Sequence, residues 1–480
     1  MKMKFNHYNA GGNMDFKFIA AGEKKASNDI LPVINPYNAN VFARTYKAGK
    51  NDIEDAILKM QNQFNKTRVM TSMEKANILN KVAKSILDNK EEFAQIIAQE
   101  AGKPIRDARM EAERAALIFN ASAEEAKRIG GEVLPMDVEP RGAGKMAVTK
   151  RFPIGIILGI TPFNFPLHLV AHKMAPAIAA GNPIIIRPAS KTPLSALMLG
   201  YAVIEAGWEA ISVLPCGTFL AEDMVKDDRI KMLTFTGSDV VGWSLKAKSG
   251  KKKVALELGG NAAVIIHEDA DIERAAARCV IGSFGYAGQV CISLQRIYAH
   301  SKIYDAFKKV LTEKTKKIIA GDPLDEKTDL SCVIDEDNLK RLEEWVKEAE
   351  TQGGKILCGG KKESALFLPA IMEDVPCNCS VVEKEVFGPV VVIEKYDDFD
   401  EALKKVNSSR YGLQAGIFTN KMNLILKAFN EIEVGGLMVN DIPTFRIDTM
   451  PYGGVKDSGT GREGPRWAIE EMTEIKTMIL

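Results

Sequence analysis

Three side chains in this sequence have the types that covalent acyl chemistry requires. Cys291 lies in FGYAGQVCISLQR, residues 284–296, where a thiolate would be a strong nucleophile but has no histidine or lysine beside it as a base. Glu257 precedes a Gly-Gly turn in ALELGGN, where partial burial would suit a general base. Asn164 is held between prolines in TPFNFP, where its amide N–H could stabilise an oxyanion. Each also has an ordinary alternative: an inert core thiol, a capping glutamate and a turn asparagine.

Two glycine-rich stretches could approach a phosphate. Residues 459–464, GTGREG, match the GxGxxG dinucleotide pattern, but no strand precedes them and too little chain follows for a βαβ unit. This stretch is predicted to be a glycine turn. Gly237 and Ser238 instead leave a predicted strand and open a predicted helix that reaches Gly242. Backbone N–H groups at a helix N-terminus favour an anion, so this is the predicted phosphate site.

Arg187 closes a predicted strand in PIIIRPAS, at the strand end where parallel sheets bind cofactors. A cation there could hold ribose hydroxyls or a 2′-phosphate. The alternative is an ordinary surface arginine.

No metal site is predicted. His168 and His172 lie one helical turn apart, but no third ligand is evident. Cys377 and Cys379 are too close in sequence for a normal zinc pair, and no second pair faces them. The chain has 7 cysteines, an odd and sparse number that argues against a disulfide framework.

The composition of the 480-residue chain is ordinary, with 46% hydrophobic and 26% charged residues. Lys and Arg number 64 and Asp and Glu 63, so the formal net charge is +1 and no nucleic-acid partner is expected. No apolar run approaches the roughly 18 residues of a transmembrane helix, and the N-terminus lacks the apolar core of a signal peptide. A cytoplasmic protein without a membrane partner is therefore expected.

Strands and helices alternate in the middle of the chain. The predicted order is strand 154–160, helix 165–181, strand 183–188, helix 192–207, strand 211–215, helix 218–226, strand 231–237 and helix 238–248. This order indicates βαβ units in a parallel, doubly wound sheet, which binds ligands at the carboxyl ends of its strands. One helix is marked at both ends, with Thr192 as N-cap, Pro193 in the first turn and Gly207 after the last residue.

The rest of the chain is predicted more coarsely. Residues 51–119 have an amphipathic helical pattern, and 130–153 are broken by Gly and Pro as in an extended ribbon. The first 30 residues are polar and irregular, and 465–480 turn from helical to extended character. A second alternation has strand candidates at 296–300, 389–396 and 436–440. The expected fold class is α/β, with two doubly wound parallel-sheet domains and a small β arm.

Seven stretches together resemble the aldehyde dehydrogenase superfamily over nearly the whole chain. They stand in the family's order and spacing: TPFNFP (161–166), RPAS (187–190), FTGSDVVG (235–242), LELGGN (256–261), GQVC (288–291), EVFGPV (385–390) and PYGGVKDSGTGREG (451–464). The C-terminal GPRWAIEEMTEIKTMI looks most like the branch that includes archaeal lactaldehyde dehydrogenase and non-phosphorylating glyceraldehyde-3-phosphate dehydrogenase.

The resemblance implies that Cys291 attacks an aldehyde and that the Asn164 amide and the Cys291 N–H hold the oxyanion. Hydride passes to NAD or NADP, and Glu257 activates the water that hydrolyses the thioester. Glu385 looks like the residue that binds the nicotinamide ribose, and Phe387 like its neighbour beside the nicotinamide. The cofactor-binding residues implied are Thr161, Pro162, Phe163, Arg187, Ser190, Gly237, Ser238, Leu258, Glu385 and Phe387.

The same resemblance implies a division into domains. Residues 1–133 and 154–256 would form the NAD(P)-binding domain, and 257–446 the catalytic domain. Segments 134–153 and 447–480 would be the oligomerisation elements of a homodimer or homotetramer.

Two departures from the family bear on the coenzyme. The family usually has lysine where this chain has Arg187, and NAD-preferring members often carry glutamate where it has Ser190. Arginine is a better bidentate phosphate ligand, and serine does not repel a 2′-phosphate as a carboxylate would. We therefore expect NADP to be accepted alongside NAD.

A third departure bears on the substrate. Relatives that take phosphorylated aldehydes tend to have arginine where this chain has Val290, which weakens the case for a dianionic substrate. Arg114 lies near where the same relatives place another anion-binding arginine, and His172 lies at a tunnel position that is often aromatic. Either side chain could equally be solvated or ion-paired. The expected substrate is a small polar or singly charged aldehyde, such as lactaldehyde or a semialdehyde.

Three alternatives stay open. A non-phosphorylating glyceraldehyde-3-phosphate dehydrogenase would take a related anionic aldehyde. A CoA-acylating aldehyde dehydrogenase would lack the carboxylate that activates water, and Glu257 is present. A non-catalytic structural homologue would have no use for Cys291, Glu257 and Asn164, which are all intact.

Overall fold

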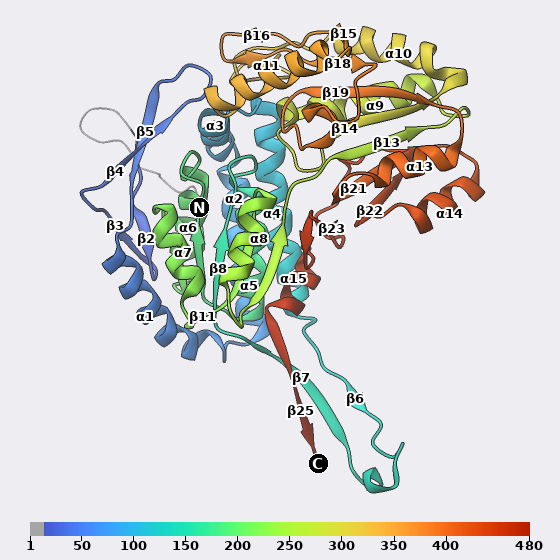
Figure 1. Ribbon diagram of the computed structural model, residues 1–480. Helices are drawn as coiled ribbons and strands as arrows, with labels where there is room; N and C mark the ends of the chain where they lie inside the picture. The colour runs from blue at the N-terminus through green and yellow to red at the C-terminus, as the bar shows by residue number, and fades with distance from the viewer. Residues whose placement is uncertain (1–13) are drawn as a thin grey trace.

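The computed structural model describes residues 14–480, which form two α/β parts and a projecting arm (Figure 1). The first part is built on an eight-stranded sheet and the second on a seven-stranded sheet. The expected α/β class with two doubly wound sheets is confirmed. No helix in these residues is both long and apolar enough to span a membrane.

The eight-stranded sheet has a parallel centre and antiparallel edges. Its strands, in spatial order, are β24 (Gly459–Thr460), β12 (Lys253–Glu257), β11 (Ile230–Thr236), β8 (Ile156–Ile160), β9 (Ile184–Arg187), β10 (Ile211–Val213), β2 (Phe18–Ala20) and β3 (Glu23–Lys25). The strands from β12 to β10 are parallel, and the others pair antiparallel. The central strands are continuous apolar runs, such as IILGI in β8, because both faces of the sheet are covered.

Helices pack on this sheet in two groups. They are α1 (Lys50–Thr67), α2 (Ser72–Asp88), α3 (Lys90–Ala101), α4 (Ile105–Ala126), α5 (His168–Ala180), α6 (Leu194–Glu205), α7 (Thr218–Lys226) and α8 (Asp239–Lys248). α5 and α6 contact β8, β9 and β10 and are themselves covered by α2, α3 and α4, whereas α7 and α8 contact β11 and β12. The helices α1 to α4 confirm the helical pattern predicted for residues 51–119.

The seven-stranded sheet is parallel except for one edge strand, β15. In spatial order it contains β15 (Lys355–Cys358), β18 (Ala370–Glu373), β19 (Val390–Tyr396), β14 (Leu294–His300), β13 (Ala262–Ile266), β21 (Gln414–Phe418) and β22 (Gly436–Val439). Its helices are α9 (Ile272–Phe284), α10 (Ser301–Thr315), α11 (Glu336–Thr351), α12 (Ser380–Glu383), α13 (Phe399–Asn407) and α14 (Met422–Glu431).

The central strand β13 shows how helices cover both faces of this sheet. Val264 and Ile266 lie in one core with residues of α9, α10 and α11. Ala263 and Ile265, which point to the opposite face, lie in another core with residues of α13 and α14. The all-apolar sequence AAVII is the consequence of this double burial.

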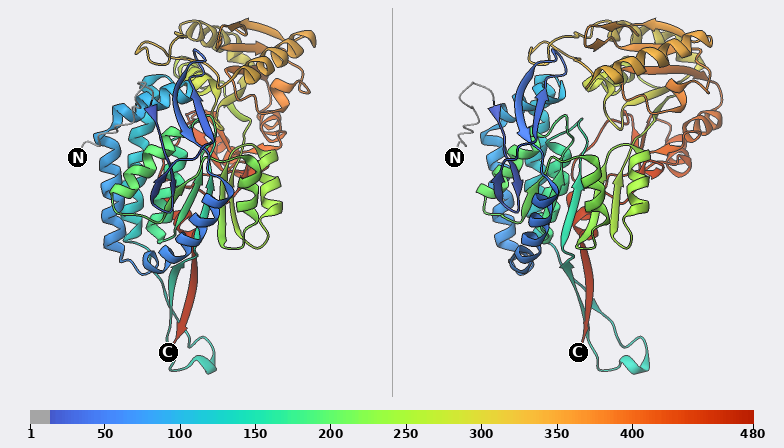
Figure 2. Two further views of the ribbon diagram at one scale, coloured as in Figure 1. Left: turned by 90° about the vertical axis from the view of Figure 1, so that its left-hand side faces the viewer. Right: turned by 60° about the vertical axis from the view of Figure 1, so that its left-hand side comes forward.

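The arm projects away from the body in every view (Figures 1 and 2). It is built from β6 (Val133–Leu134), β7 (Ala147–Pro153) and β25 (Thr473–Ile479), with the short η1 (Pro140–Gly142) in its loop and α15 (Pro465–Glu471) next to β25. β25 pairs antiparallel with β7, so that the C-terminal tail and the ribbon form one sheet. The extended ribbon and the helical-then-extended tail are both confirmed.

The first 30 residues were expected to be irregular, and residues 1–13 lie outside the described part of the chain. The rest of that segment differs from the prediction, because it contains three short strands, β2, β3 and β1 (Met14–Asp15); β4 (Ile30–Ile34) and β5 (Val41–Tyr46) follow. These strands are two to six residues long and include charged residues such as EKK, so hydrophobic periodicity is weak there.

Small two-stranded sheets complete the fold: β16 (Lys362–Glu363) with β17 (Leu366–Phe367), and β20 (Tyr411–Gly412) with β23 (Val455–Lys456).

The beginning of α6 also differs from its prediction. Its N-cap is Pro193 rather than Thr192, and no side-chain cap forms at that position. Instead the carboxylate of Glu100 in α3 accepts hydrogen bonds from the backbone N–H groups of Leu194 and Ser195, at 2.8 and 3.0 Å. The C-terminal signal is confirmed, because Gly207 adopts a φ of +105° just past the helix.

Candidate active site

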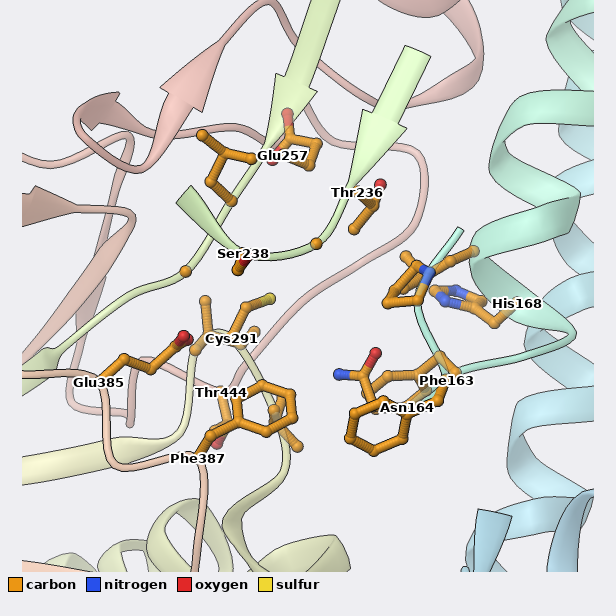
Figure 3. Close-up of a pocket in the computed structure, with 18 of the residues that line it drawn as sticks. Phe163, Asn164, His168, Thr236, Ser238, Glu257, Cys291, Glu385, Phe387 and Thr444 are labelled. Atoms are coloured by element: carbon orange, nitrogen blue, oxygen red, sulfur yellow. The ribbon is translucent and has the colours of Figure 1, made fainter. Parts of the chain in front are cut away.

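One cavity of about 450 Å³ gathers most of the predicted site residues (Figure 3). The predicted residues on its wall are Arg114, Pro162, Phe163, Asn164, Gly237, Ser238, Glu257, Leu258, Cys291, Glu385 and Phe387. Asn164 follows β8, Ser238 follows β11 and Glu257 ends β12. These three strands are parallel neighbours, so their carboxyl ends bring the side chains to one edge of the sheet.

Cys291 reaches the same cavity from the second part of the molecule, between η2 (Gly285–Gly288) and β14. The two glycines after Glu257 allow this approach. A Cβ at Gly260 would overlap the carbonyl oxygen of Cys291, and one at Gly259 would overlap the carboxylate of Glu385. The motif LELGGN therefore needs both glycines, because only bare backbone fits between the carboxylate strand and the thiol loop.

The Cys291 thiol is partly buried and has one polar partner, the Tyr452 hydroxyl, 3.0 Å from Sγ. Burial raises the pKa of Cys291 to about 12, and the hydrogen bond with Tyr452 acts in the opposite direction. The Arg446 guanidinium lies over the Tyr452 ring at 3.7 Å. The thiol at rest is therefore protonated, and a base must take its proton before it can act as a nucleophile.

Glu257 is a buried carboxyl group, and its Oε2 has no hydrogen-bond partner in the described residues. Burial and the nearby Glu463 raise the pKa of Glu257 well above its ordinary value, against the effects of Arg446 and Lys173. Glu463 carries the charge instead. Although burial opposes ionisation, His172, Lys173 and Arg446 lower the pKa of Glu463 to about 2. A carboxyl group poised in this way can exchange a proton near neutral pH.

The Asn164 side chain is fixed by its own hydrogen bond. Its Nδ2 donates to the Gln289 carbonyl at 2.9 Å, close in sequence to Cys291. The amide group is directed toward the middle of the cavity, where Cys291 lies (Figure 3). A second N–H of the same nitrogen stays available to an oxygen atom bound at Cys291.

Glu385 and Phe387 lie across the cavity from Phe163 and Asn164 (Figure 3). The Glu385 Oε1 accepts a hydrogen bond from the Gly260 N–H at 2.9 Å. Burial raises the pKa of Glu385 to about 7. The rings of Phe163 and Phe387 meet edge to face, with 5.8 Å between their centres.

Four predicted residues do not line this cavity: Thr161, Arg187, Ser190 and His172. The first three lie together past the carboxyl ends of β8 and β9. The Thr161 N–H donates to the Arg187 carbonyl at 3.2 Å, and Arg187 Nη2 lies 3.3 Å from Ser190 Oγ. The side chain of His172 is fully buried behind the wall, and its Nε2 lies 2.9 Å from Arg446 Nη2.

Arg114 is ion-paired and also lines the cavity. Its Nε and Nη2 donate to the two oxygens of Asp448, at 2.9 and 2.7 Å. His168 Nε2 lies 2.9 Å from the same carboxylate. Asp448 is thus a third polar group beside His168 and His172, which the sequence did not reveal. The atoms of these three residues that could ligate a metal ion lie within 4.8 Å of one another. The guanidinium groups of Arg114 and Arg446 already contact Asp448, so the cluster has cationic partners without a metal ion.

Sequence reasoning missed several side chains that surround the reacting residues. They are Lys173, Arg446, Asp448, Tyr452 and Glu463. One signal was present: NDIPTFRIDTMPYGG, residues 440–454, carries charged residues in a turn-rich connection directly after a strand. Lys173 lies on α5, whose residues are all buried. A charged residue in an otherwise apolar buried helix indicates that a specific polar partner lies beside it.

The chain is similar to known proteins over nearly its whole length. The model of the aldehyde dehydrogenase family matches residues 23–478. A 3-sulfolactaldehyde dehydrogenase of Priestia aryabhattai is 46% identical over 96% of both chains, and a lactaldehyde dehydrogenase of Methanococcus aeolicus is 40% identical over 94% of this chain and 97% of its own.

Two solved structures are also similar. Aldehyde dehydrogenase 21 from Physcomitrella patens, in complex with the reaction product succinate, has a TM-score of 0.96 and 42% identity over 98% of both chains. Glyceraldehyde-3-phosphate dehydrogenase GapN from Methanocaldococcus jannaschii, complexed with NADP, has a TM-score of 0.90 and 40% identity over 94% of this chain and 98% of its own. The chain belongs to the aldehyde dehydrogenase family, whose members oxidise aldehydes to carboxylic acids with NAD or NADP.

Proposed function

We propose that this protein oxidises a small aldehyde with one negative charge, or a small polar one, by covalent catalysis at Cys291. The single observation that carries the proposal is the convergence of Cys291, Glu257 and Asn164 on one cavity beside Arg114 and Arg446. The first three side chains can perform the chemistry, and the two guanidinium groups suit a small anionic end.

The residues at the carboxyl ends of β8, β9 and β11 fit a nicotinamide dinucleotide. Thr161 Oγ1 and Arg187 Nε are buried and have no hydrogen-bond partner in the described residues, which suits hydroxyl or phosphate oxygens of a ligand. Ser238 is the N-cap of α8, so backbone N–H groups there would face a pyrophosphate. Glu385 would hold the nicotinamide ribose, and Phe163 and Phe387 would pack beside the ring. When bound, the nicotinamide accepts the hydride that aldehyde oxidation releases.

In the first half of the reaction, the Cys291 thiol gives its proton to ionised Glu257, directly or through a water molecule. Its sulfur then adds to the aldehyde carbon, which forms a C–S bond and an oxyanion. The Asn164 amide and the Cys291 N–H donate to this oxyanion. Loss of hydride, with its two electrons, restores the carbonyl group and leaves a thioester on Cys291.

In the second half, Glu257 first releases the thiol proton to solvent and then takes a proton from a water molecule that attacks the thioester carbon. The C–S bond breaks, the carboxylic acid leaves and the sulfur regains a proton. Lys173 favours the ionised form of Glu257, whereas the charge of Glu463 favours its protonated form. Lys173 Nζ lies 3.5 Å from the Glu463 carboxylate and donates to Thr236 Oγ1 at 2.8 Å.

The proposed substrate class rests on the charges at one end of the cavity. Arg114 and Arg446 line the wall, whereas Val290, beside the nucleophile, supplies no third cation. The relatives named for 3-sulfolactaldehyde and lactaldehyde act on short aldehydes, one with a sulfonate and one neutral. A three-carbon aldehyde with a sulfonate or carboxylate is the substrate we favour.

For the coenzyme, we propose that NADP is accepted alongside NAD. Arg187 and Ser190 face each other at 3.3 Å, so a 2′-phosphate would meet a guanidinium and a hydroxyl group rather than a carboxylate.

We also propose that the arm joins two or more copies of the chain. β25 is an edge strand, and Ile475, Met478 and Ile479 on it are exposed. An exposed apolar edge of this kind is a template for pairing with another chain. All seven cysteines lie in the described part of the chain and none forms a disulfide, which fits the reducing cytoplasm as its location.

A substrate panel tests the proposed activity. Purified protein is assayed with 3-sulfolactaldehyde, succinic semialdehyde, lactaldehyde and glyceraldehyde 3-phosphate, each with NAD and with NADP and without CoA, by the absorbance of the reduced nicotinamide. We expect the highest kcat/KM for an aldehyde with one negative charge, and kcat/KM for NADP within about a thousandfold of that for NAD. No turnover with any aldehyde, or turnover only with CoA, contradicts the proposal.

A further inference from the structure

Asp448 is a buried carboxylate directly behind the cavity wall, and none of the reaction steps above uses it. Its side chain is 4% exposed. Oδ1 accepts from Arg114 Nη2 at 2.7 Å and lies 2.9 Å from His168 Nε2, and Oδ2 accepts from Arg114 Nε at 2.9 Å. Both oxygens are therefore occupied, chiefly by the bidentate pair with Arg114.

Arg446 is the second guanidinium of this end of the cavity. Its Nε lies 3.6 Å from Asp448 Oδ1, and its Nη2 donates to Glu463 at 3.1 Å. Its side chain is buried, and one face packs on Tyr452. Arg446 is thus held in position from two sides, while part of it still reaches the cavity.

The charges around this end do not balance. Three cations, Arg114, Arg446 and Lys173, meet two carboxylates, Asp448 and Glu463. Arg114 is paired with Asp448, and Lys173 and Arg446 share Glu463. One positive charge remains for a ligand, so a single negative charge on the substrate completes the set.

The two imidazoles nearby add no charge to this count. Burial lowers the pKa of His168 and of His172, with further effects of Arg114 and Arg446, so both are neutral. Burial likewise favours the protonated form of Glu257, so the count describes the resting enzyme, before Glu257 ionises to take the thiol proton. A further guanidinium, that of Arg341 in α11, lines the cavity on the side of Glu385. Burial opposes ionisation of Asp448, but its hydrogen bonds with His168 and Arg114 keep its pKa below the ordinary range.

We propose that Asp448 is a specificity-determining residue, which cancels the charge of Arg114 and so limits the cavity to aldehydes with one negative charge. This inference rests on the proposed function. In the presence of Asp448, the second negative charge of a phosphorylated aldehyde finds no unpaired cation beside Arg114 and Arg446 and is repelled by a buried carboxylate. Without Asp448, Arg114 and Arg446 would offer two positive charges to a dianion.

The test compares Asp448→Asn with the unaltered enzyme on three short aldehydes. They are lactaldehyde, which is neutral, 3-sulfolactaldehyde, which has one negative charge, and glyceraldehyde 3-phosphate, which approaches two near neutral pH. We expect the kcat/KM ratio of the phosphate to the sulfonate substrate to rise at least about tenfold, while kcat/KM for lactaldehyde stays within about threefold. Asparagine keeps the size and an acceptor oxygen, so the change is mainly one of charge.

A matched double variant separates charge from structure. Asp448→Asn combined with Arg114→Met removes one anion and one cation, so the count returns to one positive charge. Its ratio of phosphate to sulfonate kcat/KM should return to within about threefold of the unaltered enzyme. A purely structural role of Asp448 would lower kcat/KM for all three aldehydes together in both variants.

The outcomes distinguish the inference from the proposed function. If the unaltered enzyme does not prefer 3-sulfolactaldehyde over lactaldehyde, the favoured substrate with one negative charge is wrong, before any variant is made. If that preference is present but Asp448→Asn leaves the phosphate-to-sulfonate ratio unchanged, or lowers all three rates equally, the role of Asp448 is wrong while the proposed function stands.

Discussion

At the residue scale, the reactivity of Cys291 is set by two opposing effects. Burial raises the pKa of its thiol to about 12, and the Tyr452 hydroxyl 3.0 Å away lowers it. Burial raises the pKa of Tyr452 itself well above its ordinary value, so the hydroxyl keeps its proton and can donate to a thiolate. Tyr452 is therefore a donor that stabilises the ionised sulfur rather than a base.

Replacing Tyr452 with Phe should slow the reaction of Cys291 with iodoacetamide about 3- to 10-fold near pH 8, because the thiolate loses a hydrogen bond and the thiol pKa rises further. The measurement is the rate of alkylation of Cys291, followed by peptide mass. Tyr411→Phe is the control, since Tyr411 is also buried but does not line the cavity. Equal rates in all three proteins would mean that Tyr452 does not stabilise the thiolate.

Glu257 leads to a prediction about pH. A base acts only in its ionised form, and the raised pKa of Glu257 moves that ionisation toward neutral pH. kcat should therefore rise with pH across a range above that in which an ordinary glutamate ionises, and Glu257→Gln should lower kcat by about 10²- to 10⁴-fold and remove the rise. Steady-state rates across this range measure both effects. A rate that falls over the same interval in the unaltered enzyme would contradict the assignment.

At the element scale, local signals predicted the parallel strands and most helix ends, because each depends on neighbours in sequence. The helix 218–226 and the turn at Gly207 were predicted correctly from such signals. The N-terminal cap of α6 was not predicted correctly, because Glu100 lies 94 residues from the Leu194 N–H group whose hydrogen bond it accepts. The charged cluster of Arg446 and Asp448 was missed for the same reason: its partners lie in α4 and α5.

The cap supplied by Glu100 predicts a stability effect. Glu100→Ala would leave the buried N–H groups of Leu194 and Ser195 without acceptors, and should lower the free energy of unfolding by about 2 to 4 kcal/mol. Glu100→Gln, which keeps one acceptor oxygen, should lose less. Chemical denaturation of the three proteins measures the difference. If Glu100→Ala is as stable as the unaltered protein, the carboxylate does not stabilise α6.

At the scale of the whole molecule, two sheets and an arm serve different purposes. The carboxyl ends of β8, β11 and β12 and the loop before β14 meet at one cavity. The arm projects away from both sheets and carries the C-terminus near its outer end, beside the loop between β6 and β7 (Figure 1). The family resemblance could be recognised from motifs, whereas the shape of the cavity and its charge balance required the folded chain.

The proposed role of the arm predicts a change in assembly. Ile479→Glu places a charge on the exposed edge strand β25 and should shift the protein to a smaller oligomer, because a buried charge without a partner opposes association. Light scattering after size-exclusion chromatography gives the mass. The control is Lys476→Glu, because Lys476 is an exposed residue of the same strand. Thr473 is buried against the body and is therefore not a suitable control position. An unaltered protein that is already monomeric would contradict the proposal.

The most direct test of the central claim is to trap the acyl group on Cys291. Glu257→Gln is mixed with NADP and an aldehyde substrate, and the release of reduced coenzyme and the mass of the protein are followed together. We expect at most one reduced coenzyme per active site, formed more slowly than in the unaltered enzyme because the base that takes the thiol proton is missing, and an acyl group on Cys291 that is not hydrolysed. No reduced coenzyme and no adduct, repeated turnover at the unaltered rate, or an adduct on any of the other six cysteines would contradict the mechanism.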